Sequence, residues 1–340
     1  HWSLDLNANR AAGHLDVPFS LYGDEPVTAR LDYLWLGAVN DPPGAAGDAE
    51  VAPASPPEPA GSPVRLNPAR IPPLDIQVED LRYGSIRFGS VSALALHEGD
   101  GIELIGLEGI GDGFIFQAEG RSRLSPTVDA SRLGVRFQSD DVGATLDFMG
   151  FNRGMEAQSG VFEAEVSWQG GLRSDWLEAI AGTATVDIRD GSLVGVEPGA
   201  GRVFGLLSLQ ALPRRLALDF KDVFGKGTSF DRITGDFRLE DGHAYTDDLV
   251  MSGPAANMAV VGRTGLVTRD YDQTAVIGAD FGGTFPVAGA VVAGPAVGAA
   301  LFLLAEIFNN PFSAQITYRL TGPWDDPVIA RVPAGGGSKN

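Results

Sequence analysis

The chain lacks cysteine altogether and has only three lysines among its 340 residues. Without cysteine it cannot build a disulfide framework, a thiolate metal site, an iron–sulfur cluster or a thiol nucleophile. Its 44 acidic residues outnumber the 25 basic ones, which gives a formal charge of −19. Binding to nucleic acid, or by charge to an anionic lipid surface, needs patches of lysine and arginine. The acidity therefore excludes nucleic-acid binding and argues against docking by charge onto anionic lipid. The hydrophobic content of 44% is ample for a core.

Common catalytic motifs are missing as well. There is no G-x-S-x-G elbow, no phosphate-binding P-loop and no EF-hand loop. The histidines show no metal-binding spacing, and we interpret all four as solvated loop residues: His1, His14, His97 and His243. Paired carboxylates occur at Asp140-Asp141, Asp247-Asp248 and Asp325-Asp326. Neighbours on a strand point to opposite faces, so these pairs do not supply the facing carboxylates that a glycosidase needs. We interpret them as solvated turns, with calcium binding as the alternative, and expect no enzyme, no cofactor and no metal.

The composition divides the chain into regions. It begins at His1 without an initiator methionine or a signal-peptide pattern, so we interpret it as a piece of a longer protein. Ten of the 22 prolines fall in residues 41–73, which predicts a flexible loop or linker, with a docking site for a proline-binding partner as the alternative. The expected regions are N-terminal strands at 1–40, the linker at 41–73, a β-meander at 74–173, a C-terminal region at 174–333 and a disordered tail at 334–340.

Short stretches of alternating apolar and polar residues run through most of the chain. This is the pattern of strands with one buried and one wet face. The clearest stretches are 27–33, 74–79, 114–119, 162–168, 184–189, 233–239 and 316–320. Hairpin turns between strands are indicated by four Asp-Gly pairs: Asp100-Gly101, Asp112-Gly113, Asp190-Gly191 and Asp241-Gly242. Strands joined by such turns predict a mainly β fold, built as an antiparallel meander.

Few helices are expected. Asp175–Glu178 opens a short one with a capping-box pattern, and Gly182 ends it. A second is predicted at 201–215. Residues 281–305 carry no charge, and Pro295–Phe308 is predicted as an apolar helix that, at about 21 Å, is too short to span a bilayer. Because it is apolar on nearly every side, it must be buried or lie against lipid.

Two architectures fit the alternation. A single sheet left uncovered on its apolar face would form a trough about 15–20 Å wide, which suits acyl chains. Burial is worth about 0.8 kcal/mol per methylene, so such a trough could hold a two-tailed lipid without a specific polar pocket. Alternatively, the apolar faces close on each other as an ordinary sandwich. The pattern alone favours the sandwich.

The second half of the chain carries a series of separate motifs in a defined order. They are Asp190–Arg202, Gly205–Arg215, Leu218–Phe220, Asp222–Gly227, Asp247–Ala256, Arg269–Gln273, Gly294–Ala300 and Thr321–Trp324. In this order they resemble the C-terminal region of the YhdP family of AsmA-like proteins. The resemblance is close over residues 174–328 and looser before them. It favours the uncovered sheet over the sandwich.

The resemblance implies an elongated antiparallel β-sheet groove, a bridge-like lipid carrier, with a few short helices near the C-terminus. It implies non-enzymatic phospholipid transport between the inner and outer membranes of a Gram-negative envelope, in support of the outer-membrane barrier. The chain would be the periplasmic portion of a protein anchored in the inner membrane by a helix outside this sequence. The alternatives are a closed β-sandwich scaffold that binds envelope partners, and a carbohydrate-active enzyme with facing carboxylates.

On this interpretation, two sets of apolar residues contact the acyl chains of phospholipids. The groove-lining candidates are Phe114, Phe116, Phe162, Val166, Trp168, Val186, Ile188, Phe237 and Leu239. In the predicted apolar helix, the candidates for contact with the inner leaflet of the outer membrane, or with an envelope partner at the C-terminal end, are Val297, Leu301, Leu304 and Phe308. Ordinary core packing is the alternative for each of these residues.

Overall fold

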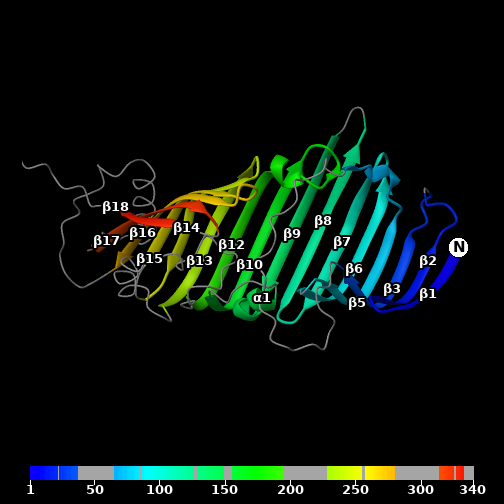
Figure 1. The fold of residues 1–340 in the computed structure, drawn as a ribbon, viewed down its shortest axis with the longest axis horizontal. Coiled ribbons are helices and arrows are strands. Elements are labelled where there is room, and N and C mark those ends of the chain that lie inside the picture. Colours follow the sequence, from blue (N-terminus) through cyan, green and yellow to red (C-terminus); the bar gives the residue numbers. More distant parts are fainter. Residues whose placement is uncertain are drawn as a thin grey trace, which may run out of the picture. The chain divides into compact units, whose positions relative to one another are not determined.

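The computed structural model describes residues 1–21, 23–36, 65–84, 86–125, 129–148, 155–193, 228–254, 257–279, 314–324 and 327–332. Within them, sixteen strands join one sheet in the order β1-β2-β3-β5-β6-β7-β8-β9-β10-β12-β13-β14-β15-β16-β17-β18, and β4 pairs with β11 (Figure 1). The predicted mainly β fold is confirmed.

The strands are β1 (Trp2–Ala8), β2 (Ala11–Val17), β3 (Val27–Leu36), β4 (Arg65–Leu66), β5 (Leu74–Tyr83), β6 (Ile86–Glu98), β7 (Gly101–Gly111), β8 (Phe114–Leu124), β9 (Asp129–Ser139), β10 (Met155–Trp168), β11 (Leu172–Arg173), β12 (Ala181–Leu193), β13 (Thr228–Glu240), β14 (His243–Ser252), β15 (Asn257–Gly265), β16 (Asp270–Ala279), β17 (Ala314–Pro323) and β18 (Val328–Val332).

Contacts within the chain define two compact units. Unit 1 comprises residues 1–111, 119–131 and 169–176. Unit 2 comprises residues 112–118, 132–168 and 177–340.

In unit 1, the strands from β1 to β7 sort apolar and polar side chains onto opposite faces. Leu15, Ala29 and Ile76 lie side by side on β2, β3 and β5. The core of this face consists of Ala29, Leu31 and Val78, packed against Leu6, Leu15, Leu34, Ile76 and Leu81. Successive side chains of a strand alternate in direction, so Arg30 points to the other face. There its guanidinium donates a hydrogen bond of 2.8 Å to the Asp75 carboxylate.

One pair of strands departs from the predicted antiparallel meander. β3 and β5 are parallel, with Val27 opposite Leu74. A parallel pair needs a connection that returns along the length of the strand, which a two-residue hairpin cannot supply. In the sequence, β3 and β5 are separated by residues 37–73, which include the proline-rich segment. Its last residues include the 3-10 helix η1 (Pro68–Arg70), and the side chains of Pro68 and Pro73 are fully buried.

The predicted Asp-Gly turns have mixed outcomes. Asp241-Gly242 is the turn between β13 and β14, with φ values of 47° and 74° that fit a type I′ hairpin. Asp112-Gly113 lies between β7 and β8, whereas the turn before β7 is Gly99-Asp100, one residue earlier than predicted. The turn prediction at Asp190-Gly191 is wrong, because both residues lie inside β12. A Cβ atom at Gly191 would lie 2.3 Å from the carbonyl oxygen of Glu156, so the glycine permits close strand approach.

The helix predictions also need correction. Near Asp175 the chain forms only the 3-10 helix η2 (Trp176–Ala179), and Gly182 belongs to β12 rather than to a helix end. The α-helix α1 (Val142–Phe148) was not predicted. The helices predicted at 201–215 and 295–308 lie outside the described residues. No helix in the described part of the chain is long and apolar enough to cross a membrane.

Candidate functional site

Three adjacent strands of unit 2 share one apolar face. Phe162 of β10 lies opposite Val186 of β12, and Gly182 of β12 lies opposite both Val166 of β10 and Leu239 of β13. Side chains two residues apart on a strand share a face. Seven of the predicted groove-lining residues therefore lie together on what we call the apolar face of unit 2: Phe162, Val166, Trp168, Val186, Ile188, Phe237 and Leu239.

Exposure differs across this apolar face. Phe162 keeps 41% of its surface exposed, whereas Val166, Phe237 and Leu239 are each 8% exposed. Trp168, Val186 and Ile188 are half-buried. Solvent therefore reaches the face chiefly around Phe162.

Phe114 and Phe116 form an aromatic cluster of their own. Phe114 of β8 is 3% exposed, and its ring centroid lies 6.4 Å from that of Phe116 and 5.4 Å from that of Phe137. The ring of Phe114 is inclined by 22° to that of Phe116 and by 19° to that of Phe137. Phe137 of β9 was not among the sequence candidates, although the alternation of β9 places it on the same side of the strand as Leu133 and Val135.

Sequence reasoning also missed how far the apolar face extends. From Ile188 a row of directly paired residues continues through Ile233, Met251, Met258 and Ile277. These four additional residues are between 2% and 7% exposed. The signal was hidden because the opposite face of β14, β15 and β16 is buried too: Val250, Ala259 and Val276 are at most 3% exposed. Strands that are apolar on both sides lose the period of two that reveals a face.

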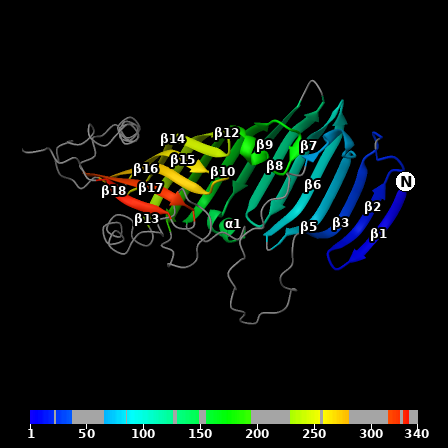
Figure 2. The same ribbon diagram turned by 45° about the horizontal axis from the view of Figure 1, so that its top comes forward.

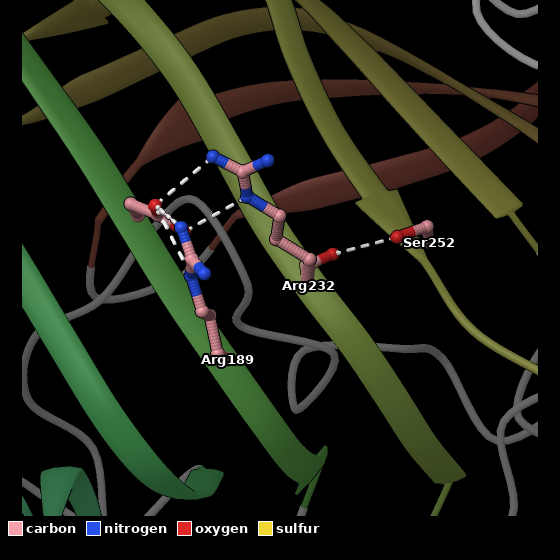
Figure 3. A network of polar contacts seen from close by, with 4 residues as sticks. Arg189, Arg232 and Ser252 are labelled. Carbon is pink, nitrogen blue, oxygen red and sulfur yellow. Dashed lines mark hydrogen bonds and ion pairs between the residues drawn. The ribbon is translucent and has the colours of Figure 1, made fainter.

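The opposite face of β12 and β13 carries charge. Asp187 accepts hydrogen bonds from Arg189, at 2.7 Å, and from Arg232, at 2.9 Å (Figure 3). These hydrogen bonds, that from Arg189 first, lower the pKa of Asp187 from 3.8 to about 2. The Ser252 hydroxyl donates to the backbone oxygen of Arg232. The charges of this face pair with one another and leave the apolar face to apolar side chains.

The loop prediction is wrong for three of the four histidines. His14, His97 and His243 all lie in strands. His14 bonds through Nδ1 to the Asp5 carboxylate at 2.8 Å, and His97 bonds through Nε2 to the backbone oxygen of Ile71 at 2.7 Å. These contacts explain why polar rings are tolerated within a sheet.

The prediction of solvated turns is wrong for Asp247-Asp248, which lies inside β14, whereas Asp140-Asp141 lies between β9 and α1. Asp141 Oδ1 accepts the N–H of Ala144 at the start of α1, at 2.9 Å. Asp248 Oδ1 accepts the N–H of Asp236 at 2.7 Å, and burial raises the pKa of Asp248. Among the described residues, no group of three or more histidines and carboxylates could hold a metal ion. The predicted lipid-contacting residues Val297, Leu301, Leu304 and Phe308 lie outside this part of the chain.

Comparisons with known proteins agree on one family. A family model described as YhdP protein matches residues 1–329. The intermembrane phospholipid transporter YhdP of Escherichia coli (strain K12) is 29% identical over 221 residues, which cover 63% of this chain and 17% of that protein. The chain thus spans only about a sixth of the length of this relative. No solved structure matches the chain.

Proposed function

The chain belongs to the YhdP family, and on that premise we propose that the apolar face of unit 2 binds the acyl chains of phospholipids in transit between two membranes. The E. coli relative is an intermembrane phospholipid transporter. The observation that carries the proposal is the alignment of Phe162, Val186 and their neighbours on one face of β10, β12 and β13, with Phe162 41% exposed. Unit 1 has an apolar cluster of its own on β1, β2, β3 and β5.

An apolar face is sufficient for this task. Each methylene group exposed to water costs about 0.8 kcal/mol, so an acyl chain of a dozen methylenes costs roughly 10 kcal/mol outside a membrane. Contact with the apolar face offsets most of this cost without a covalent step. The proposed role is therefore carriage and not catalysis, with the headgroup left in water.

We place this activity in a Gram-negative envelope, between the inner and outer membranes, where it supports the outer-membrane barrier. The chain would be a periplasmic portion of an inner-membrane-anchored protein. At its C-terminal end, Val297, Leu301, Leu304 and Phe308 would contact the inner leaflet of the outer membrane or an envelope partner. Support for these points comes from the family membership.

A structural role is favoured for one part of the sheet. Both faces of β14–β16 are buried, with Met258 and Ile277 on one side and Ala259 and Val276 on the other. Such a stretch resembles the core of a closed sandwich more than an open binding surface. A scaffold that binds envelope partners is the second candidate, and it would leave lipid absent from the purified protein.

The test introduces one charge onto the apolar face of unit 2 in the full-length protein. A carboxylate at position 162 must lose hydration when an acyl chain covers it, so Phe162→Asp should lower co-purifying phospholipid about tenfold. Ile115→Asp is the matched control, because Ile115 is also exposed, at 40%, but alternates with Phe114 and Phe116 and points the other way. Native mass spectrometry and lipid extraction give the readout. Equal phospholipid in both variants would reject the proposal.

A further inference from the structure

The helix α1 sits on the apolar face of unit 2. Figures 1 and 2 both show it beside one end of β10, against which it packs. A Cβ atom at Gly160 would lie 2.8 Å from Val142 Cγ2 and 3.8 Å from Ile188 Cγ1. Gly160 and Ile188 are directly paired on the face that carries Phe162. Val142 therefore occupies the place of the side chain that Gly160 lacks.

Contacts at its N-terminal end fix α1 in this place. Asp141 Oδ1 accepts the N–H of Ala144, and the hydroxyls of Ser139 and Thr145 lie 2.8 Å apart. Val142 and Leu146 are 8% and 6% exposed. The helix is thus held both by apolar packing on β10 and by polar contacts to the end of β9.

The character of β10 changes on either side of α1. Toward the start of the strand, Glu156 lines a cavity of about 560 Å³ together with Asp140, Asp141 and Asp190, which we call the acidic cavity. Beyond Gly160, the face of β10 that carries Phe162 presents only apolar side chains: Phe162, Ala164, Val166 and Trp168. Glu156 and Phe162 are six residues, or about 20 Å, apart along β10.

We propose that α1 is the boundary wall of the lipid path, with Val142 seated on Gly160 so that acyl chains lie on the Phe162 side and do not enter the acidic cavity. This inference rests on the function proposed above. The separation has a physical reason on both sides of the helix. Acyl chains gain less apolar burial in a cavity lined mostly by polar side chains than on the apolar face, and the four carboxylates of the cavity repel the negative phosphate of a phospholipid.

The experiment places a photoreactive residue on either side of the wall in the full-length protein. p-Benzoylphenylalanine replaces Phe162 in one version and Glu156 in another, and both are exposed residues of β10. Cells are grown with radiolabelled phosphate, and labelled phospholipid attached to the purified protein is counted after illumination. With α1 in place, attachment at position 162 should exceed that at position 156 by about tenfold, the ratio of two populations about 1.4 kcal/mol apart.

Two variants, one that adds a charge and one that adds an apolar side chain, should displace α1 from β10. Val142→Asp places a charge on the apolar face and expels α1, and Gly160→Leu fills the space that Val142 occupies. Either should raise attachment at position 156 by about fivefold, a gain near 1 kcal/mol. Gly106→Leu is the control, since a Cβ atom there would meet nothing within 4 Å. Limited proteolysis tests whether each variant is folded. If Val142→Asp does not fold, Gly160→Leu alone tests the proposal.

The outcomes separate the two proposals. No attachment at position 162 in the unaltered protein would overturn the proposed function itself. Attachment at 162 with equal attachment at 156 would leave that function in place and overturn the wall. Attachment at 156 that stays low in both folded opening variants would also overturn the wall, because something other than α1 would then exclude lipid.

Discussion

At the scale of single residues, charged groups of unit 2 form ion pairs on the face opposite to the apolar face. Asp187 is the clearest case, since two arginines from adjacent strands, Arg189 and Arg232, bond its carboxylate. Its side chain is 26% exposed and both arginines are about half exposed, so solvent screens the network. We therefore expect a contribution of no more than about 1 kcal/mol to the free energy of unfolding.

The pH dependence of that contribution to stability follows from the direction in which folding shifts the pKa of Asp187. The folded-state pKa of Asp187 is about 2, below the ordinary 3.8, so the folded protein holds the ionised form more tightly. The stabilisation is complete above the ordinary value and is lost as the pH falls through about 2. Urea unfolding of the parent and of Asp187→Asn should therefore differ at neutral pH and converge at the acidic end. Asp32→Asn, an exposed change on β3, is the control. A difference that is as large at pH 2 as at neutral pH would contradict this account.

At the scale of elements, glycines inside strands determine how closely the strands approach. Gly182 of β12 has φ 154°, and a Cβ atom there would lie 2.0 Å from the carbonyl oxygen of Glu165. Gly262 of β15 repeats the arrangement, with 2.4 Å to the carbonyl oxygen of Asp272. Neither contact can be relieved by turning a side chain, because the obstacle is backbone.

Replacing Gly182 by alanine should therefore lower the free energy of unfolding by about 2–3 kcal/mol. The measurement is the shift of the urea midpoint at an unchanged slope. Gly106→Ala serves as the control, since a Cβ atom there meets open space and the change should stay within about 1 kcal/mol. If both variants unfold at the same urea concentration, close strand approach is not what selects glycine at position 182.

The same elements show how far sequence reasoning reaches. Alternation found β3, β5, β8, β10, β12, β13 and β17, because one face of each is apolar and the other polar. It could not tell that Asp190-Gly191 lies within a strand, since the need for glycine comes from Glu156 on the neighbouring strand. Nor did it find α1, whose seven residues are too few for a helical period.

The candidate site was predictable to the same extent. Alternation within β10, β12 and β13 indicates that Phe162, Val186 and Phe237 each lie on the apolar side of their own strand. The antiparallel pairing of the three strands then brings these sides together on one face. Alternation cannot say which of them is exposed, since that depends on what packs over each position. Phe162 at 41% and Phe237 at 8% look alike in the sequence.

At the scale of the whole molecule, the function proposed above requires the apolar face of unit 2 to combine a binding surface with a core. Around Phe162 the face is open, and at Met258 and Ile277 it is closed. The open part contributes little to folding, because an exposed side chain gains little apolar burial. The closed part contributes much, because truncation of a packed side chain leaves a cavity. Lipid binding and stability should therefore respond to different residues of the same face.

The last prediction uses this division. Met258→Ala removes a side chain that is 7% exposed, and should lower the free energy of unfolding by about 2–4 kcal/mol while leaving the co-purifying phospholipid unchanged. Phe162→Ala should do the reverse, with a stability loss below about 1.5 kcal/mol and several-fold less phospholipid. Urea unfolding and lipid extraction from the same preparations measure both quantities. If Met258→Ala removed phospholipid from a folded protein, acyl chains would have to reach β15, and the open face would extend beyond β13. If Phe162→Ala cost as much stability as Met258→Ala, the open part of the face would itself be core.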